Sequence, residues 1–199
     1  MGALRTAKDK WVEAGLQALA AGGINAVRVE ALAKTLGVTK GGFYGYFADR
    51  PALLTAMLDT WERESVDDVL ERVEQEGGSW QDQLRFAGQL TLSAGRLFDI
   101  DLAVRDWARR DSAVAERLRR VDNRRMKLLR DMLGATCSDA EEVEARCLLA
   151  FCMAIGSHLL AADHPGFSRL QVRARAGRII LDVSGSGGVS PETPSKKVG

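Results

Sequence analysis

Apolar residues recur every three to four positions along most of the chain, which is the spacing of an amphipathic α-helix. The first such segment, residues 4–21, ends at a pair of glycines, and a shorter one follows at 29–36. Gly37 interrupts that second segment, and Thr39 can then cap a third helix running to about Tyr46. These segments predict a small helical unit at the start of the sequence.

A longer helix is expected next. Asp49 can cap it, and Pro51 falls in its first turn, where the missing amide hydrogen costs no hydrogen bond. Apolar positions continue at helical spacing as far as the glycines at 77 and 78. No later segment keeps the two-residue alternation of a strand. Further helical patterns occupy 80–97, 100–110, 112–133, 139–162 and 168–183. The sequence predicts an all-α fold.

Composition places the chain among soluble globular proteins. Of its 199 residues, 46% are hydrophobic and 28% charged, which is ordinary for that class. No stretch approaches the roughly 18 uninterrupted apolar residues that suggest a membrane span, and the first residues lack the apolar core of a signal peptide. We therefore expect a cytoplasmic protein with no membrane partner. Residues 184–199 have no aromatic side chain and should form a disordered tail.

The net charge of +1 is unevenly distributed. Residues 1–50 carry seven Lys and Arg against four Asp and Glu, whereas residues 51–183 carry 19 against 22. A basic N-terminal unit on an acidic body suits a protein that meets a polyanion at one end. Chance could produce a difference of this size, so the asymmetry only supports evidence found elsewhere.

The cysteines give little sign of metal or redox chemistry. Three cysteines, Cys137, Cys147 and Cys152, suit a reducing compartment better than a disulfide scaffold. On one helix Cys147 and Cys152 would point about 140° apart, and neither they nor His158 and His164 have the spacing of metal ligands. We expect buried structural cysteines and neither metal nor cofactor, with a redox switch as the less favoured alternative.

The most specific signal lies in the first sixty residues. Two short helices joined by a glycine-containing turn, with a packing helix before them, are typical of a helix-turn-helix, whose second helix enters the DNA major groove. The run VEALAKTLGVTKGGFYGYF, followed by a capped long helix, resembles the tetracycline-repressor (TetR) family of transcriptional regulators. The matching residues are Ala33, Gly37, Val38, Thr39, Lys40, Gly41, Tyr44, Phe47, Arg50, Leu53 and Leu54. The resemblance is strong over residues 5–60 and extends beyond them only in the number of helices.

This resemblance implies a domain organisation and a function. Residues 1–50 would form the helix-turn-helix DNA-binding domain, and residues 51–183 a helical domain for effector binding and dimerisation. The protein would be a homodimeric repressor that binds a palindromic double-stranded DNA operator. A small hydrophobic or amphipathic effector would release it.

The resemblance also implies which residues meet DNA. Lys40 would reach a base edge or a phosphate, Tyr44 would place its hydroxyl on a phosphate, and Thr39 would cap the helix or touch a phosphate. Arg50 stands where the family usually has lysine, so a planar guanidinium replaces an ammonium group and the positive charge is kept. Arg28 stands where a capping Thr or Ser is usual. The complete set is Arg28, Thr39, Lys40, Gly41, Gly42, Tyr44, Tyr46 and Arg50.

The glycines of the third helix need an explanation. Gly41, Gly42 and Gly45 each cost a helix about 1 kcal/mol relative to alanine. Burial of Phe43 and Phe47, at roughly 1.5–3 kcal/mol for each side chain, can offset that cost. In return, glycine lets the helix backbone approach DNA closely. Gly42 and Gly45 depart from the family pattern, so direct readout of bases should depend on few side chains, chiefly that of Lys40.

Two sets of apolar residues are assigned to the C-terminal unit. The segments 139–162 and 168–183 carry apolar and small residues along one side, and the resemblance makes them the four-helix bundle of a dimer. Alternatively, they only complete their own core. The expected dimer residues are Phe151, Ile155, Leu159, Ile180 and Leu181. The large aromatic groups available for an effector cavity are Trp61, Phe86, Phe98, Trp107 and Phe151. These too could simply be core.

Other functions are less favoured. Residues 105–131 hold nine arginines, several with acids three or four positions away, which predicts a salt-bridged solvated surface rather than an anion site. No Ser-His-Asp order, phosphate loop or paired-carboxylate motif indicates an enzyme. The remaining alternative is a helix-turn-helix regulator controlled by a protein partner or by cysteine oxidation instead of a small ligand.

Overall fold

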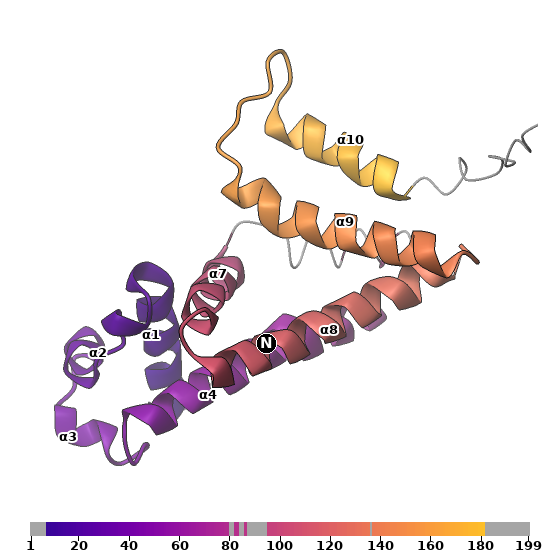
Figure 1. Ribbon diagram of the computed structural model, residues 1–199. Helices are drawn as coiled ribbons and strands as arrows, with labels where there is room; N and C mark the ends of the chain where they lie inside the picture. The colour runs from indigo at the N-terminus through magenta and orange to yellow at the C-terminus, as the bar shows by residue number, and fades with distance from the viewer. Residues whose placement is uncertain (1–6, 80–81, 84–85, 87–94, 136, 182–199) are drawn as a thin grey trace, which may run out of the picture.

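The computed structural model describes residues 7–79, 82–83, 86, 95–135 and 137–181. Within these residues the backbone forms helices and turns and no strand, which confirms the all-α prediction (Figure 1). Most of the expected segment 80–97, and the whole of the expected tail at 184–199, lie outside the described residues. Each helix in the described ranges is too short or too polar to cross a bilayer.

The N-terminal unit, which we call the head, consists of α1 (Ala7–Gly22), the 3-10 turn η1 (Ile24–Ala26), α2 (Val29–Leu36) and α3 (Lys40–Phe43). It occupies one end of the molecule (Figure 1). Gly37 ends α2 in the left-handed conformation, at φ 68° and ψ 28°, where glycine carries no steric penalty. The predicted break at this glycine is therefore confirmed.

The third helix is shorter than the sequence predicted. It ends at Phe43 instead of near Tyr46, and a turn follows in which the amides of Tyr46 and Phe47 both donate to the carbonyl of Phe43. Thr39 occupies the N-cap position, but its side chain makes no capping hydrogen bond. The predicted N-cap position is therefore confirmed, but the hydrogen bond expected from the Thr39 hydroxyl is not made. The glycine-rich composition explains the short helix, since each glycine weakens it.

A long helical path leaves the head. It comprises α4 (Arg50–Glu62), a five-residue π turn η2 (Arg63–Asp67) and α5 (Asp68–Glu76). Asp49 caps α4 by accepting a 2.8 Å hydrogen bond from the amide of Ala52, and Pro51 lies in the first turn, both as predicted. The path ends at Gly77, where φ is 65°. The π turn was not predicted.

The remaining helices form the body together with α5. They are α7 (Arg96–Ala108), α8 (Ser112–Gly134), α9 (Ala140–Leu159) and α10 (Arg169–Leu181). The carboxylates of Asp111 and Asp139 cap α8 and α9 by accepting from amides two and three residues ahead. α7 packs against α1 and α8, α8 against α9, and α9 against α10, which lies at the far side from the head (Figure 1).

One hydrophobic core runs from the head into the body. It joins Leu16 of α1, Phe43 of α3, Trp61 of α4 and Val104 of α7, all fully or almost fully buried. Gly15 leaves room for Met57 between α1 and α4, since a Cβ there would lie 2.6 Å from its sulfur and the Met57 side chain would have to shift. A second cluster lies farther along, between α5, α8 and α9. α1 is thus shared by the helix-turn-helix and by the body.

Candidate nucleic-acid interface

Aromatic packing holds the third helix in place. Phe43 is completely buried, with its ring 5.3 Å from that of Trp11 in an edge-on contact and 5.4 Å from that of Phe47 in a stacked contact. Phe47 is also buried, so both residues lie in the core as predicted. The ammonium of Lys8 lies 5.4 Å from the centre of the Phe47 ring, a cation–π contact. These contacts explain how a helix with two glycines keeps its position.

The outer side of the same segment is open. Every residue from Gly37 to Gly42 is exposed, and Tyr44 and Tyr46 expose 57% and 46% of their surface. The Tyr44 ring rests edge-on against buried Phe43 at 5.3 Å. An aromatic side chain anchored at its base and exposed at its hydroxyl can donate a hydrogen bond to a partner outside the chain.

Charge on this surface centres on Lys40. Its ammonium lies 2.6 Å from a carboxylate oxygen of Glu30 on α2, and both side chains are more than half exposed. The hydrogen bond with Lys40 is the main reason that the pKa of Glu30 lies below its usual value, and the same bond raises the pKa of Lys40. Arg28, also exposed, lowers the pKa of Glu30 further.

The glycines are not required by the packing of the chain itself. A Cβ on Gly41 or Gly42 would meet only the hydroxyl of Thr39, at 3.7 and 4.0 Å, and one on Gly45 would meet a carbonyl oxygen at 3.6 Å. These are ordinary contact distances, and none of these glycines has positive φ. The space in front of α3 is therefore open to a partner.

We expect Gly41→Ala to separate folding from binding. Stability should stay the same or rise by up to about 1 kcal/mol, because alanine is the better helix former. A methyl group that holds the backbone off DNA should cost contacts to phosphate worth about 1.5–3 kcal/mol, or roughly tenfold or more in affinity. Thermal unfolding and DNA titration measure the two effects. Gly134→Ala, at the open end of α8, is the control, and unchanged DNA binding by the Gly41 variant would contradict this account.

Arg50 has a structural role that the sequence did not reveal. Its Nε donates to the carbonyl of Val27 at 2.7 Å, and a terminal nitrogen donates to the carbonyl of Ile24 at 2.8 Å. The side chain is half-buried and ties the start of α4 to the η1 turn. It therefore positions the helix-turn-helix, whatever it contacts in addition. Backbone carbonyls have no sequence signature, so no pattern pointed to this role.

The aromatic residues predicted for an effector cavity make different contacts within the body. Trp61 is buried and donates from its indole nitrogen to Asp101 at 3.2 Å, while the Phe98 ring lies 4.2 Å from that of His158. Trp107 lies in the main core and Phe86 beside the second cluster. The guanidinium of Arg105 lies 5.6 Å from the centre of the Phe151 ring.

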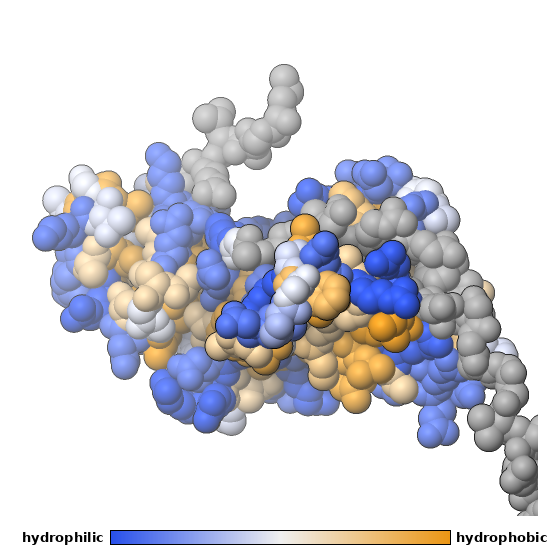
Figure 2. All heavy atoms as spheres, turned by 90° about the horizontal axis from the view of Figure 1, so that it is seen from above, coloured by the Kyte–Doolittle hydropathy of each residue, from blue (hydrophilic) through white to orange (hydrophobic). Residues whose placement is uncertain are grey.

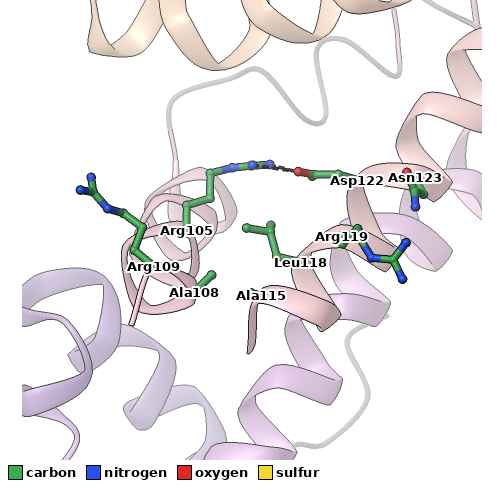
Figure 3. Close-up of a pocket in the computed structure, with 8 residues that line it drawn as sticks. All are labelled: Arg105, Ala108, Arg109, Ala115, Leu118, Arg119, Asp122 and Asn123. Atoms are coloured by element: carbon green, nitrogen blue, oxygen red, sulfur yellow. Dashed lines mark hydrogen bonds and ion pairs between the residues drawn. The ribbon is translucent and has the colours of Figure 1, made fainter. Parts of the chain in front are cut away.

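Among the hollows on the surface of the described residues are two that none of those five aromatic residues lines. One, of about 430 Å³, lies between α7 and α8, with an apolar floor that includes Leu118 and arginines around it (Figure 3). The other, of about 830 Å³, lies between the end of α1 and α7. Arg105, on the edge of the first hollow, forms a two-pronged ion pair with Asp122 at 2.7 and 2.9 Å (Figure 3).

The arginine-rich segment is salt-bridged as predicted, though part of it is buried. Arg110 pairs with Asp106 on the surface at 3.3 Å. Asp101, by contrast, is 5% exposed and accepts hydrogen bonds from Arg105 and Arg125, each at 2.9 Å. The prediction of a wholly solvated surface is therefore wrong for these residues, because the partner carboxylate lies on α7 beneath them.

The expected dimer residues differ in exposure. Leu159 exposes 63% of its surface, while Phe151, Ile155 and Ile180 are half-buried; the side chain of Leu181 lies outside the described residues. Further large apolar groups are exposed nearby, and a view onto the α10 side shows apolar patches among hydrophilic ones (Figure 2). They are Leu148, Leu149, Leu160, Phe167, Leu170 and Ile179.

The cysteines only partly follow the expectation that they are buried. Cys147 is fully buried, and burial is the main cause that raises the pKa of its thiol. Cys137 is half-buried and Cys152, on α9, is exposed, so the prediction is wrong for Cys152. A raised pKa disfavours the reactive thiolate at Cys147.

A two-helix motif with an exposed second helix, packed on a helical body, defines the chain as a helix-turn-helix protein. Residues 12–57 match the model of the bacterial regulatory proteins of the tetR family. This part of the chain is therefore the N-terminal domain of that family, whose members are DNA-binding transcriptional regulators. No curated protein matches the chain.

Solved structures share the fold over most of the chain. A transcriptional regulator from Rhodococcus sp. Rha1 is 21% identical, with a TM-score of 0.68 over 88% of this chain and 94% of that one. A regulator from Saccharomonospora viridis in complex with choline is 13% identical, with a TM-score of 0.73 over 89% and 96%. FadR from Bacillus subtilis in complex with stearoyl-CoA is also 13% identical, with a TM-score of 0.63 over 87% and 97%. At these sequence identities, the similarity shows that this chain and these proteins share a fold.

Proposed function

We propose that the protein is a ligand-responsive repressor that binds a palindromic operator as a homodimer. The observation that carries the proposal is the exposed outer side of the helix-turn-helix, where Lys40, Tyr44 and Tyr46 surround a helix held from behind by Phe43. In this motif the second helix enters the major groove. Residues 1–50 are the proposed DNA-binding domain, and residues 51–183 the proposed effector-binding and dimerisation domain.

The proposed roles follow from chemistry and exposure. Lys40 reaches a base edge or a phosphate, while Tyr44 and Tyr46 contact phosphates or sugars through their hydroxyls. Exposed Arg28 adds charge from the start of α2. Gly41 and Gly42 allow close approach, Thr39 contacts a phosphate, and Arg50 contributes chiefly by positioning. Because phosphate contacts carry little sequence information, one head alone selects a site poorly, and two are needed.

The second head is supplied by a dimer through α9 and α10. Large apolar side chains such as Leu159, Leu170 and Ile179 are each more than 60% exposed on these helices. Contiguous exposed apolar surface marks sites of association. A two-fold axis through a bundle of α9 and α10 presents two heads, and symmetric heads require a symmetric operator.

The body is the proposed site of a small hydrophobic or amphipathic effector. Two solved relatives of this fold hold choline and stearoyl-CoA, which supports a small-molecule role for the same part of this chain. The effector favours a separation of the heads that no longer matches one helical turn of DNA. A coupling free energy of about 1–3 kcal/mol between effector binding and DNA binding is enough to release the operator. We propose no catalytic role and assign no cofactor.

Arg96 provides a physical link between body and head. At the start of α7, its guanidinium donates to Glu13 of α1 at 2.5 and 2.7 Å and to Glu64 of the π turn at 2.6 Å. Burial opposes the charge, but these hydrogen bonds raise the pKa of Arg96 above its usual value. One side chain thus joins the head, the π turn and α7, three elements that must move together if an effector is to reorient the head.

We expect Arg96→Gln to loosen the orientation of the head. Binding to the preferred operator should weaken by about 1 kcal/mol, or roughly fivefold, within the range of coupling residues that touch neither ligand. The affinity for operators whose half-sites are moved by one base pair should fall less than the affinity for the preferred operator. Titration of a spacing series measures both. Arg119→Gln, which removes a surface pair with Glu116, is the control. A spacing preference identical to wild type would contradict the link.

The proposed function is tested by DNA binding of Lys40→Ala and Tyr44→Phe. Both residues are exposed, so folding should be unchanged by circular dichroism and thermal unfolding. Operator affinity should fall roughly tenfold, since charge-assisted hydrogen bonds contribute about 1.5–3 kcal/mol. Salt must be stated, because phosphate binding depends steeply on it. Unaltered affinity in both variants would refute this assignment of the interface.

A further inference from the structure

An acidic residue lies within the proposed DNA surface. Glu30, in the first turn of α2, is exposed and faces Lys40 of α3, with 2.6 Å between carboxylate oxygen and ammonium. Arg28 acts on the same carboxylate. Among the other acids of residues 1–50, Glu13 bonds Arg96 and Asp49 caps α4. Glu30 therefore interacts with two of the cations proposed to meet DNA.

The ion pair between Glu30 and Lys40 contributes little to the stability of the fold. Surface pairs between exposed side chains contribute little to stability, because solvent screens them and ordering two long side chains costs entropy. The pKa of Glu30 lies below its usual value, chiefly through the hydrogen bond with Lys40, so the carboxylate is ionised throughout the neutral range. A permanent negative charge beside a polyanion must weaken association, and its effect therefore appears in DNA binding.

We propose that Glu30 is a specificity-determining residue, which holds Lys40 and so withholds that cation from non-specific DNA. The proposal rests on the proposed function, in which α3 meets DNA. Non-specific affinity comes almost entirely from cations that neutralise phosphates. With Lys40 engaged by Glu30, each head loses one such cation on arbitrary sequence. At the correct operator, a base edge that accepts hydrogen bonds from lysine replaces the carboxylate.

The consequence is a difference between two affinities. Removing the charge of Glu30 frees Lys40 for any phosphate, so non-specific binding gains. Specific binding gains less, because Lys40 has already exchanged Glu30 for a base in that complex. Specificity is the ratio of the two affinities, and an acid that weakens the unwanted complex more than the wanted one increases it.

The test compares wild type with Glu30→Gln, which keeps the shape and a hydrogen-bond acceptor but not the charge. Two duplexes are titrated by fluorescence anisotropy between about 50 and 200 mM KCl: one selected by the wild-type protein from random DNA, and one of the same length with scrambled sequence. The matched control is Glu74→Gln, which makes the same charge change at an exposed position of α5. Thermal unfolding should be the same in all three proteins.

We expect Glu30→Gln to bind the scrambled duplex roughly threefold to tenfold more tightly, with a salt slope steeper by about 0.9 for each head. Affinity for the selected duplex should change by less than about twofold, so the specificity ratio falls. Glu74→Gln should match wild type. In a Lys40→Ala background the gain on scrambled DNA should shrink to less than about twofold, because the released cation is absent and only the direct repulsion by Glu30 is removed.

Three results would overturn the proposal. Both duplexes could be bound as by wild type, which would leave Glu30 without a role. Alternatively, Glu30→Gln could weaken the selected complex, which would make Glu30 itself a base contact. A gain of undiminished size in the Lys40→Ala background would exclude the route through Lys40. Failure of the proposed function has a different result, since wild-type protein would then bind and select no DNA at all.

Discussion

Replacing Phe43 by alanine should unfold the head and abolish DNA binding. The side chain is completely buried and packs on Trp11 and Phe47. Truncating a buried phenylalanine costs about 3–5 kcal/mol, which lowers the melting temperature of a chain of this size by roughly 6–20 °C. The expected loss of stability is large because the α3 backbone contains two glycines and depends on the Phe43 side chain for its position. Differential scanning calorimetry and DNA titration measure the two losses.

A matched control is available in Phe167, whose side chain is 68% exposed between α9 and α10. Because Phe167 lies beside the surface proposed for dimerisation, this control concerns the head alone, whose structure Phe167→Ala should leave unchanged. One core extends from α1 to α8. Phe43→Ala should therefore lower the melting temperature of the main unfolding transition, and should not merely add a small transition at lower temperature. A Phe43→Ala protein that melts like wild type would show that the aromatic packing does not hold α3.

Replacing Asp101 by asparagine should cost about 3–5 kcal/mol, the usual loss when one partner of a buried ion pair is removed. Its two oxygens accept from Trp61, Arg105 and Arg125. Without the charge, the counter-charge that remains for the two guanidiniums among the described residues is Asp122. Chemical denaturation measures the loss. Asp131→Asn, which removes an exposed pair with Lys127, should change stability by less than about 0.5 kcal/mol.

The same residue gives a prediction for acid unfolding. Burial acts to raise the pKa of Asp101, but Arg125 and Arg105 outweigh it and hold the pKa below its usual value. A carboxylate with a lowered folded-state pKa stabilises the fold above the unfolded value of about 3.9, and that stability disappears as the pH falls through the folded value. Wild type should therefore lose stability below about pH 4 more steeply than Asp101→Asn. Equal slopes would contradict this assignment.

Local signals in the sequence were sufficient for most of the helices. The bounds of α2 follow directly from the apolar spacing and from Gly37, and those of α4 from Asp49 and Pro51, because capping and left-handed turns depend on residues within a few positions. The burial of Phe43 and Phe47 was predictable for a similar reason. A helix with glycines needs large anchors, and these were the side chains at the correct spacing.

Features that depend on distant partners were not predictable. The π turn at 63–67 contains neither proline nor glycine, so nothing local marks it. Arg50 bonds carbonyls 23 and 26 residues away, and the Arg96 link joins residues 83 apart. Large aromatic residues in the body could be assigned to a cavity or a core equally well from spacing alone. The structure places Trp61 and Trp107 in the core, and the roles proposed for DNA-facing residues stay predictions.

Selection of bound sequences from random duplex DNA by the full chain tests the central claim most directly. The account predicts a two-fold symmetric consensus whose half-sites lie about one helical turn apart, recovered as a complex with two protein chains. Enrichment of no sequence, or of a single asymmetric half-site by a monomer, would contradict it.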